Sequence, residues 1–256
     1  MKNEMKDFKK KNMLLMKELC LSSMKSYYKE AVEAAQKNDV SYDEFLFELL
    51  THEQSERFNR RIERFLKESK LPLEKTLDNY DFKRIPHAAR QKAKAILSGY
   101  FLSKNENILV FGNPGSGKTH LLCGVARELI LNNKRVLFST CSQLVQQLLI
   151  SKRELTLNKT LKKLSKFDAI IIDDIGYVQH NRTEMEVLFT FLADRYERGS
   201  IMLTSNLPFS KWEKIFKDPM VTTAAIDRLI HHSIIIELNV ESYRLKHAKE
   251  NLKEKK

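Results

Sequence analysis

Residues 107–119 read NILVFGNPGSGKT, and this stretch decides the fold. Asn107 to Phe111 is a short apolar run typical of a buried strand, and Gly112 to Thr119 fits the pattern G-x-x-x-x-G-K-[S/T]. A strand, a glycine-rich turn and a helix in this order aim successive backbone N–H groups at one point. The pattern predicts a phosphate-binding loop. The residues expected to contact a nucleotide are Gly112, Asn113, Pro114, Gly115, Ser116, Gly117, Lys118, Thr119 and His120.

The later apolar run AIIIDD ends in two acids, Asp173 and Asp174. Parallel strands end at the same edge of a sheet, so these acids are expected near the loop. Lys118 would reach the β- and γ-phosphates, while Thr119 and Asp173 would hold Mg²⁺. Asp174 would orient or deprotonate the attacking water, and Asn206, after the next apolar run, would contact the γ-phosphate. The alternative for Asn206 is a simple turn residue.

From residue 88 onward, short β-branched runs alternate with helical patterns, which predicts a parallel sheet covered on both faces. The expected strands are 107–111, 136–139, 169–173, 200–204 and 234–238. The expected helices are 88–97, 118–131, 142–150, 157–164, 183–197, 211–216 and 222–230.

The chain before this region has a different character. Residues 1–68 show helical spacing of apolar residues, and Ser41 with Glu44 forms a capping-box pattern at the start of one helix. Residues 69–87 contain two prolines and no sustained period, although they are too apolar for a free linker. We therefore predict a small helical domain at 1–68, a linker packed on the next domain at 69–87, and an α/β domain at 88–256.

Composition limits the classes of function. The 256 residues carry 45 basic and 33 acidic side chains, a net charge of +12 and a pI near 9.5. Such an excess favours a polyanionic partner over a merely solvated basic surface. The three cysteines form no CxxC pair, and no apolar run is long enough to span a membrane. These features predict a cytoplasmic protein without a membrane partner.

Two basic segments are candidates for contact with DNA. Residues 151–166 contain a single acid, Glu154, among their basic side chains, so most of these bases have no local partner. Residues 57–67 also carry arginines, for which pairing with nearby glutamates is an equal alternative. No base-reading motif is present, so contact with the duplex backbone without sequence specificity is expected. The candidates are Arg57, Arg60, Arg61, Arg64, Lys152, Arg153, Lys159, Lys162, Lys163 and Lys166.

Five stretches carry a family resemblance that covers nearly the whole chain: EKTLDNYDF (residues 74–82), GNPGSGKTHL, IIIDDIGY, LADRYERGSIMLTSNLPFSKWEKIF and AAIDRLIHHSIIIELNVESYRLK. In these stretches, the chain resembles the IstB family of ATP-binding accessory proteins of insertion sequences. It is more distantly similar to the DnaC helicase loaders. The N-terminal helices also look like the small domain that precedes the ATPase in IstB proteins.

The resemblance implies a P-loop AAA+ ATPase that uses ATP and Mg²⁺, with a five-stranded parallel sheet in the order 5-1-4-3-2 after a small all-α domain. It also implies self-association into a ring or spiral in which Arg228 of one subunit completes the ATP site of the next. The alternative for Arg228 is a local pair with Asp227. Arg244 matches the sensor-2 position loosely. Asp174 stands where this family more often has Glu, which implies slow hydrolysis.

Two functions follow from the resemblance. The first is an ATP-dependent protein that binds duplex DNA and assists a transposase. The second is a DnaC-like adaptor that loads a replicative helicase during DNA replication. The N-terminal helices and EKTLDNYDF favour the first. A small-molecule P-loop kinase is disfavoured by the missing substrate lid and by the Arg228 motif.

Overall fold

The computed structural model describes residues 2–176, 181–212 and 219–243, and the chain divides into two compact units, Met1–Arg64 and Phe65–Lys256. The division falls inside helix α3 (Tyr42–Ser69). None of the helices in these described ranges is long and apolar enough to cross a membrane.

The N-terminal unit is built from α1 (Lys2–Glu18), α2 (Ser22–Asn38) and the larger part of α3. Met24, Ala31 and Leu49 form its small buried core. The first residues of α2 have no side-chain cap of their own. Glu53 of α3 supplies one instead, because its Oε2 accepts hydrogen bonds from the backbone N–H groups of Ser23 (2.8 Å) and Met24 (2.7 Å).

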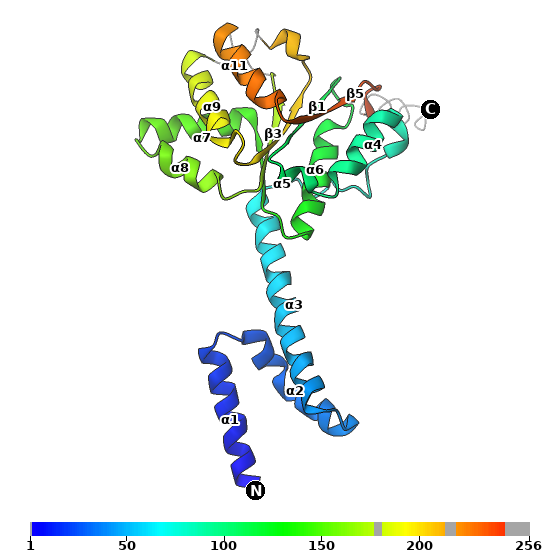
Figure 1. Ribbon diagram of the computed structural model, residues 1–256, viewed down its shortest axis with the longest axis vertical. Helices are drawn as coiled ribbons and strands as arrows, with labels where there is room; N and C mark the ends of the chain where they lie inside the picture. The colour runs from blue at the N-terminus through cyan, green and yellow to red at the C-terminus, as the bar shows by residue number, and fades with distance from the viewer. Residues whose placement is uncertain (1, 177–180, 213–218, 244–256) are drawn as a thin grey trace, which may run out of the picture. The chain divides into compact units, whose positions relative to one another are not determined.

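The second unit contains a five-stranded parallel sheet in the order β2-β3-β4-β1-β5, which confirms the predicted order read from the opposite edge (Figure 1). The strands are β1 (Asn107–Gly112), β2 (Val136–Thr140), β3 (Ala169–Ile175), β4 (Ser200–Ser205) and β5 (Ser233–Leu238). The three central strands are β-branched, apolar and buried on both faces, as a sheet covered on both sides requires.

Six of the predicted helices of this unit match described helices to within a few residues, whereas the short helices 82–84 and 100–103 have no sequence-based counterpart. The predicted helix 211–216 lies mostly outside the described residues. The helical elements are η1 (Phe82–Arg84), α4 (His87–Ile96), α5 (Tyr100–Ser103), α6 (Lys118–Leu131), α7 (Cys141–Arg153), α8 (Leu157–Leu164), α9 (Arg182–Arg195), η2 (Phe209–Lys211) and α11 (Pro219–Ile230).

The strand order dictates how the helices are layered. The chain passes from β1 to β2 in one direction along the sheet, and then from β2 through β3 and β4 to β5 in the other. Right-handed crossovers therefore place α6 on one face, and α7, α9 and α11 on the other (Figure 1). The direction changes beside β1, which opens a crevice at the carboxyl ends of β1 and β4.

Candidate functional site

The loop between β1 and α6 lies at the centre of this crevice. Gly117 has a φ of 94°, a backbone conformation that favours glycine, and a Cβ at this position would lie 3.2 Å from the Tyr80 ring. Helix α6 begins at the next residue, so its first N–H groups face the loop. An anion placed there would meet backbone donors and the positive end of the helix dipole.

Lys118 supplies the fixed positive charge of the loop. Its side chain is only 6% exposed, and Nζ donates hydrogen bonds to the carbonyl oxygens of Gly112 (2.8 Å) and Asn113 (3.0 Å). These carbonyls hold the ammonium group inside the turn, at the position where the motif predicts phosphate contact.

Asp173 lies at the end of β3 as predicted, and two hydroxyl groups hold its carboxylate. Thr119 Oγ1 donates to Asp173 Oδ1 at 2.8 Å, and Thr204 Oγ1 donates to the same oxygen at 2.6 Å. Asp173 and Thr204 are both buried. A carboxylate beside a threonine hydroxyl is an oxygen donor set of the kind Mg²⁺ prefers, so Asp173 and Thr119 fit the predicted metal role.

A bulge separates the roles of the two neighbouring acids. The pairing of β3 with β4 shifts between Ile172 and Ile175, so β3 carries one extra residue there. Asp174 has a φ of 59°, and its backbone N–H donates to Thr204 Oγ1 at 2.8 Å. As a result, Asp173 is buried, whereas Asp174 is exposed and lines the cavity described next.

A cavity of about 450 Å³ opens over the loop. Residues 114–120 form one side of it, and Asp174 and Asn206 form another. The structure thus brings together seven of the predicted loop residues, the predicted water-orienting acid and the predicted γ-phosphate contact, whereas Gly112 and Asn113 do not line this cavity. Tyr243 and part of segment 74–85, which we call the strap, complete the lining.

Two buried polar atoms in this lining lack a protein partner. The Ser116 Oγ and the Tyr80 phenol oxygen make no hydrogen bond to any described residue. Burial raises the pKa of Tyr80 to about 12, which keeps the phenol protonated. Buried polar groups normally have partners, so these two atoms indicate that a polar ligand belongs in the cavity.

The strap packs against α6. Leu77 lies so close to Gly124 that a Cβ at that glycine would be 3.2 Å from the Leu77 backbone nitrogen. His120 Nε2 lies 2.7 Å from the Thr76 carbonyl oxygen, and the Tyr80 ring meets the His120 ring edge-on. His120 therefore anchors the strap in addition to lining the cavity.

The segment after β5 closes the other side of the loop. The Tyr243 backbone N–H donates to the Gly115 carbonyl at 2.9 Å. Arg84 of the strap donates from Nη2 to the Glu241 carbonyl at 2.9 Å, and its guanidinium lies 5.1 Å from the centre of the Tyr243 ring. Arg244, predicted as a nucleotide contact, lies outside the described residues.

Asn206 is positioned by the residues that follow β4. The Ser205 hydroxyl donates to the Leu207 carbonyl (2.9 Å) and accepts from the Leu207 N–H (3.1 Å). Trp212 is fully buried, and its Nε1 donates to the same carbonyl at 3.1 Å. These bonds fix the turn that presents Asn206 to the cavity.

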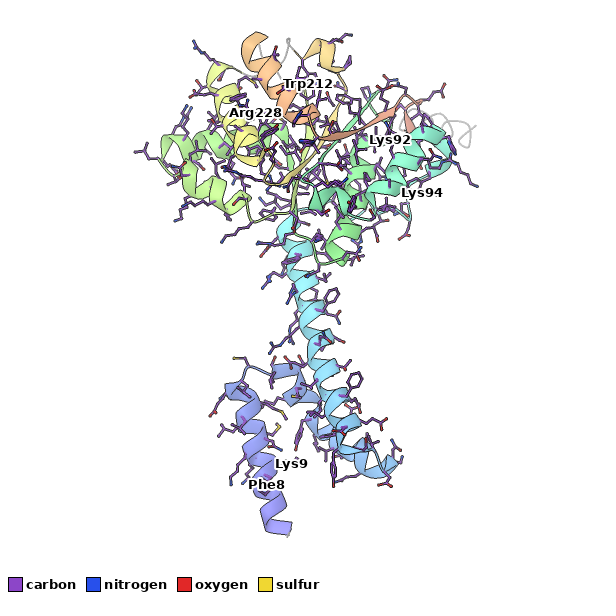
Figure 2. All side chains as sticks on the ribbon, viewed as in Figure 1. Phe8, Lys9, Lys92, Lys94, Trp212 and Arg228 are labelled. Carbon is purple, nitrogen blue, oxygen red and sulfur yellow. The ribbon has the colours of Figure 1, made fainter. Side chains whose placement is uncertain are left out.

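Arg228 lies on α11, beside α9 (Figure 2). Its guanidinium stacks 4.6 Å from the centre of the Phe189 ring, and Nη1 is 3.4 Å from the Ala224 carbonyl oxygen. Among the described residues that line the cavity, Arg228 is absent. The side chain is therefore not assembled with the nucleotide loop of its own chain.

The basic candidates of the second unit lie on α7, α8 and the turn after α8. Lys152 is paired with Glu186 at 2.9 Å. Helix α8 buries Leu161 and Leu164 against the core. The remaining candidates of this group, all exposed, are Arg153, Lys159, Lys162, Lys163 and Lys166.

The arginine candidates of the N-terminal unit differ in their surroundings. Arg57 Nε donates to Glu53 Oε1 at 2.6 Å, and Arg60 Nη1 donates to the Ser23 hydroxyl at 2.7 Å. These two side chains join α3 to α2, which gives them a structural role. Arg61 and Arg64 are exposed on α3.

Four residues of the site were not predicted by the loop motif or the strand ends. Thr204 closes the expected strand 200–204, and its contact with Asp173 depends on the neighbouring strand. Tyr80, Arg84 and Tyr243 reach the cavity from segments far from the loop in sequence. The one available signal was that Tyr80 lies in the stretch EKTLDNYDF and Tyr243 in ESYRLK, both of which carry the family resemblance.

Comparison with solved structures agrees with this architecture. The fold is similar to that of a DnaC helicase loader (TM-score 0.55, 15% identity, 65% of this chain and 98% of that one). It is also similar to AMPPCP-bound DnaA from Aquifex aeolicus (TM-score 0.57, 22% identity, 73% of this chain and 57% of that one). At these identities, the likeness concerns the fold.

Sequence comparison is more specific. A protein of Sinorhizobium fredii, described as an insertion sequence ATP-binding protein, is 43% identical over 93% of this chain and 80% of its own length. The ATP-binding protein of insertion sequence IS5376 from Geobacillus stearothermophilus is 40% identical over 89% of this chain and 91% of its own length. The model of the family described as IstB-like ATP binding protein matches residues 14–251. Because that match includes the loop, the strap and both acids, the chain belongs to the IstB-like ATP-binding protein family.

Proposed function

We propose that this protein is an ATPase that binds duplex DNA and assists a transposase in the movement of an insertion sequence. The observation that carries the proposal is the prearranged site, in which Lys118 is held inside the loop and Asp173 is held by two hydroxyls. Its relatives, described as insertion sequence ATP-binding proteins, match most of the chain and support this assignment.

Within the site, each residue has a distinct proposed task. Lys118 binds the β- and γ-phosphates, while Thr119 and Asp173 hold Mg²⁺, which neutralises phosphate charge when bound. Asp174 orients or deprotonates the attacking water at the open side of the cavity, and Asn206 contacts the γ-phosphate. The Asp174 side chain is one methylene shorter than the glutamate that the family resemblance implies at this position, so slow hydrolysis is expected.

We propose that the site is completed by self-association into a ring or spiral. Arg228 lies on α11 and is not part of the cavity of its own chain. An arginine supplied by a neighbouring subunit can stabilise the charge that develops during phosphoryl transfer. This role explains why the Arg228 guanidinium stacks on Phe189 and does not reach the phosphate-binding loop of its own chain.

The exposed bases of α8 are the proposed contacts with duplex DNA. Lys159, Lys162 and Lys163 lie on one face of α8, opposite the buried Leu161 and Leu164, and Lys166 follows in the turn after the helix. Contacts of this kind bind phosphates without reading sequence. Arg153 at the end of α7 extends the same basic surface.

The experiment begins with nucleotide binding. Parent protein and Lys118→Ala are titrated with a fluorescent ATP analogue and Mg²⁺, with Lys134→Ala, an exposed lysine, as the matched control. Lys118→Ala should lose binding and keep its circular dichroism spectrum. Equal affinity of the parent and Lys118→Ala for the ATP analogue would show that the loop is not the nucleotide site.

The second step tests the partners. The parent should bind duplex DNA in the presence of ATP and stimulate strand transfer by an insertion-sequence transposase. Binding of a replicative helicase without such stimulation would favour the loader function instead. That alternative is supported only by the fold likeness to a DnaC helicase loader, whereas the relatives described as insertion sequence proteins support the first function.

A further inference from the structure

The turn between α7 and α8 presents a leucine directly to solvent. Leu155 is 94% exposed and has a φ of 58°. The Leu155 N–H donates to the Lys152 carbonyl (3.2 Å), and the Thr156 N–H donates to the Ser151 carbonyl (2.8 Å). These two bonds form a Schellman motif in which Leu155 occupies the left-handed position that usually belongs to glycine.

Leucine is an unfavourable choice for this position. A branched side chain in the left-handed region strains the backbone, and an exposed leucine gains no burial within the chain to offset that strain. The other described non-glycine residues with positive φ are Cys20, Asp39, Lys70, Asn105, Asn133, Asp174 and Glu197. Leu155 is thus the one aliphatic side chain among them, and packing within its own chain does not explain it.

The turn that carries Leu155 is firmly built. Ser151 is buried, its hydroxyl donates to the Gln147 carbonyl at 2.9 Å, and it lies 2.8 Å from the Thr160 hydroxyl. Thr156 Oγ1 donates to the Ser151 carbonyl at 3.3 Å. A side chain on such a turn enters a contact already ordered, at a lower entropic cost than one on a loose loop.

The charges around the turn favour a polyanion. Figure 1 shows the turn at the outer edge of the ATPase unit, where α7 meets α8. Arg153 and Lys159 flank Leu155 and are exposed, and Lys162 and Lys163 follow on α8. Glu154 is the single acid of the segment, and Lys152 is neutralised by Glu186. An apolar tip surrounded by exposed cations is the pattern of side chains that enter DNA between base pairs.

We propose that Leu155 is an apolar wedge that inserts at a base step of duplex DNA while the lysines of α8 contact the flanking phosphates. The inference rests on the proposed DNA-binding function and adds a contact with the bases to it. Leucine is among the side chains that unstack base steps from the minor groove. Pyrimidine–purine steps such as TA unstack most easily, so they are the preferred place of insertion.

The test uses the full-length protein with ATP and duplexes that carry 2-aminopurine at several TA steps. The parent should raise 2-aminopurine fluorescence on binding, because unstacking relieves quenching. Leu155→Gly and Leu155→Asn should bind the duplex and lose this rise, whereas Leu155→Phe should keep it. Leu73→Asn, which changes another leucine that is 78% exposed, is the matched control and should behave like the parent.

Thermal unfolding separates the wedge from a structural role. Leu155→Gly should unfold at the same temperature as the parent or higher, because glycine suits the left-handed position. A lower unfolding temperature combined with a retained fluorescence rise would overturn the proposal in favour of packing. A fluorescence rise that Leu155→Gly retains at the parent level would overturn it as well.

Failure of the underlying function has a different signature. If the parent does not bind duplex DNA with ATP under any salt condition, both the DNA-binding function and the wedge are wrong. A triple variant tests DNA binding by α8 separately from the wedge, with Lys159, Lys162 and Lys163 all changed to Gln. If this variant binds duplex DNA more weakly and with a flatter salt dependence, DNA binding by α8 is supported whatever Leu155 does. The wedge alone is then wrong if Leu155→Gly impairs capture of the transposase and leaves the base signal intact.

Discussion

Thr204 shows how a single hydroxyl can organise two acids. It donates to the Asp173 carboxylate and accepts from the Asp174 N–H, and it is fully buried. The hydroxyl therefore fixes the direction of the metal-binding carboxylate and the backbone of the proposed water-orienting residue together. We regard Thr204 as a positioning residue, because it acts through its two neighbours.

Thr204→Val should separate this positioning from simple packing. The variant keeps the shape of the side chain, but Asp173 loses a donor and the Asp174 N–H loses its acceptor. We expect a loss of about 1–3 kcal/mol in the free energy of unfolding and a marked fall in ATP hydrolysis. Thermal unfolding and a steady-state assay at varied Mg²⁺ measure the two effects.

The conservative variant Thr204→Ser is the control, since it restores the hydroxyl. It should recover hydrolysis and the Mg²⁺ dependence of the parent. If Val and Ser variants hydrolyse ATP equally well, the hydroxyl does not position the acids.

At the residue scale, the loop and the first acid were predictable because both are local signals. The pattern from Gly112 to Thr119 occurs within one turn, and Asp173 closes an apolar run. The task of Thr204 was not predictable in the same way. It depends on the bulge in β3 and on which strand lies beside it, and both are set by tertiary pairing.

At the scale of elements, the packing of the strap on α6 accounts for a glycine inside that helix. Gly124 lies inside α6, where glycine weakens a helix relative to alanine by roughly 1 kcal/mol. The close approach of Leu77 accounts for the glycine, because a Cβ there would lie 2.9 Å from Leu77 Cγ and 3.2 Å from the Leu77 backbone nitrogen. Strands and helices followed from periodicity, whereas this contact joins segments that the sequence alone does not pair.

Gly124→Ala should therefore displace the strap although alanine favours the helix. Tyr80 would move from the cavity, so ATP affinity should fall and proteolysis within residues 74–85 should become faster. Leu77→Ala in the same chain removes the obstructing side chain and should recover part of the affinity. The measurement is a double-mutant cycle of ATP binding. Unchanged affinity in Gly124→Ala would show that the strap does not contribute to the nucleotide site.

Helices α2 and α3 offer a pH-dependent test. Burial alone would raise the pKa of Glu53, but the backbone N–H groups of α2 and the Arg57 guanidinium outweigh burial and lower it. A carboxyl whose pKa is lower in the folded state stabilises folding above its unfolded pKa. That contribution is lost as the pH falls through the folded pKa.

Glu53→Gln should thus lower the unfolding temperature of the N-terminal unit at pH 7, and the difference from the parent should shrink as the pH falls below about 4.5. Melts of both proteins from pH 7 to pH 3 measure this difference. Glu56→Gln, which changes a nearby glutamate of α3, is the control. A difference that is the same at every pH would assign the effect of Glu53 to packing.

At the scale of the whole molecule, the open question is how one chain completes its ATP site. The cavity brings Lys118, Asp174 and Asn206 together, while Arg228 lies apart on α11. A guanidinium from a second subunit would supply the missing charge. Such an arginine raises phosphoryl-transfer rates by roughly 10³-fold or more. The proposed assembly on DNA and the proposed ATPase activity would then depend on the same interface.

Mixing two inactive variants tests this dependence. Asp174→Asn has an intact arginine and an impaired site, whereas Arg228→Ala has an intact site and no arginine. Each should bind ATP and hydrolyse it poorly. The mixture should regain part of the ATPase activity, because some interfaces pair the two intact halves. Co-assembly is verified first by labelled subunits on DNA. If co-assembled mixtures stay as inactive as their components, Arg228 acts within its own chain, where its contacts with Phe189 and Ala224 support α11 against α9.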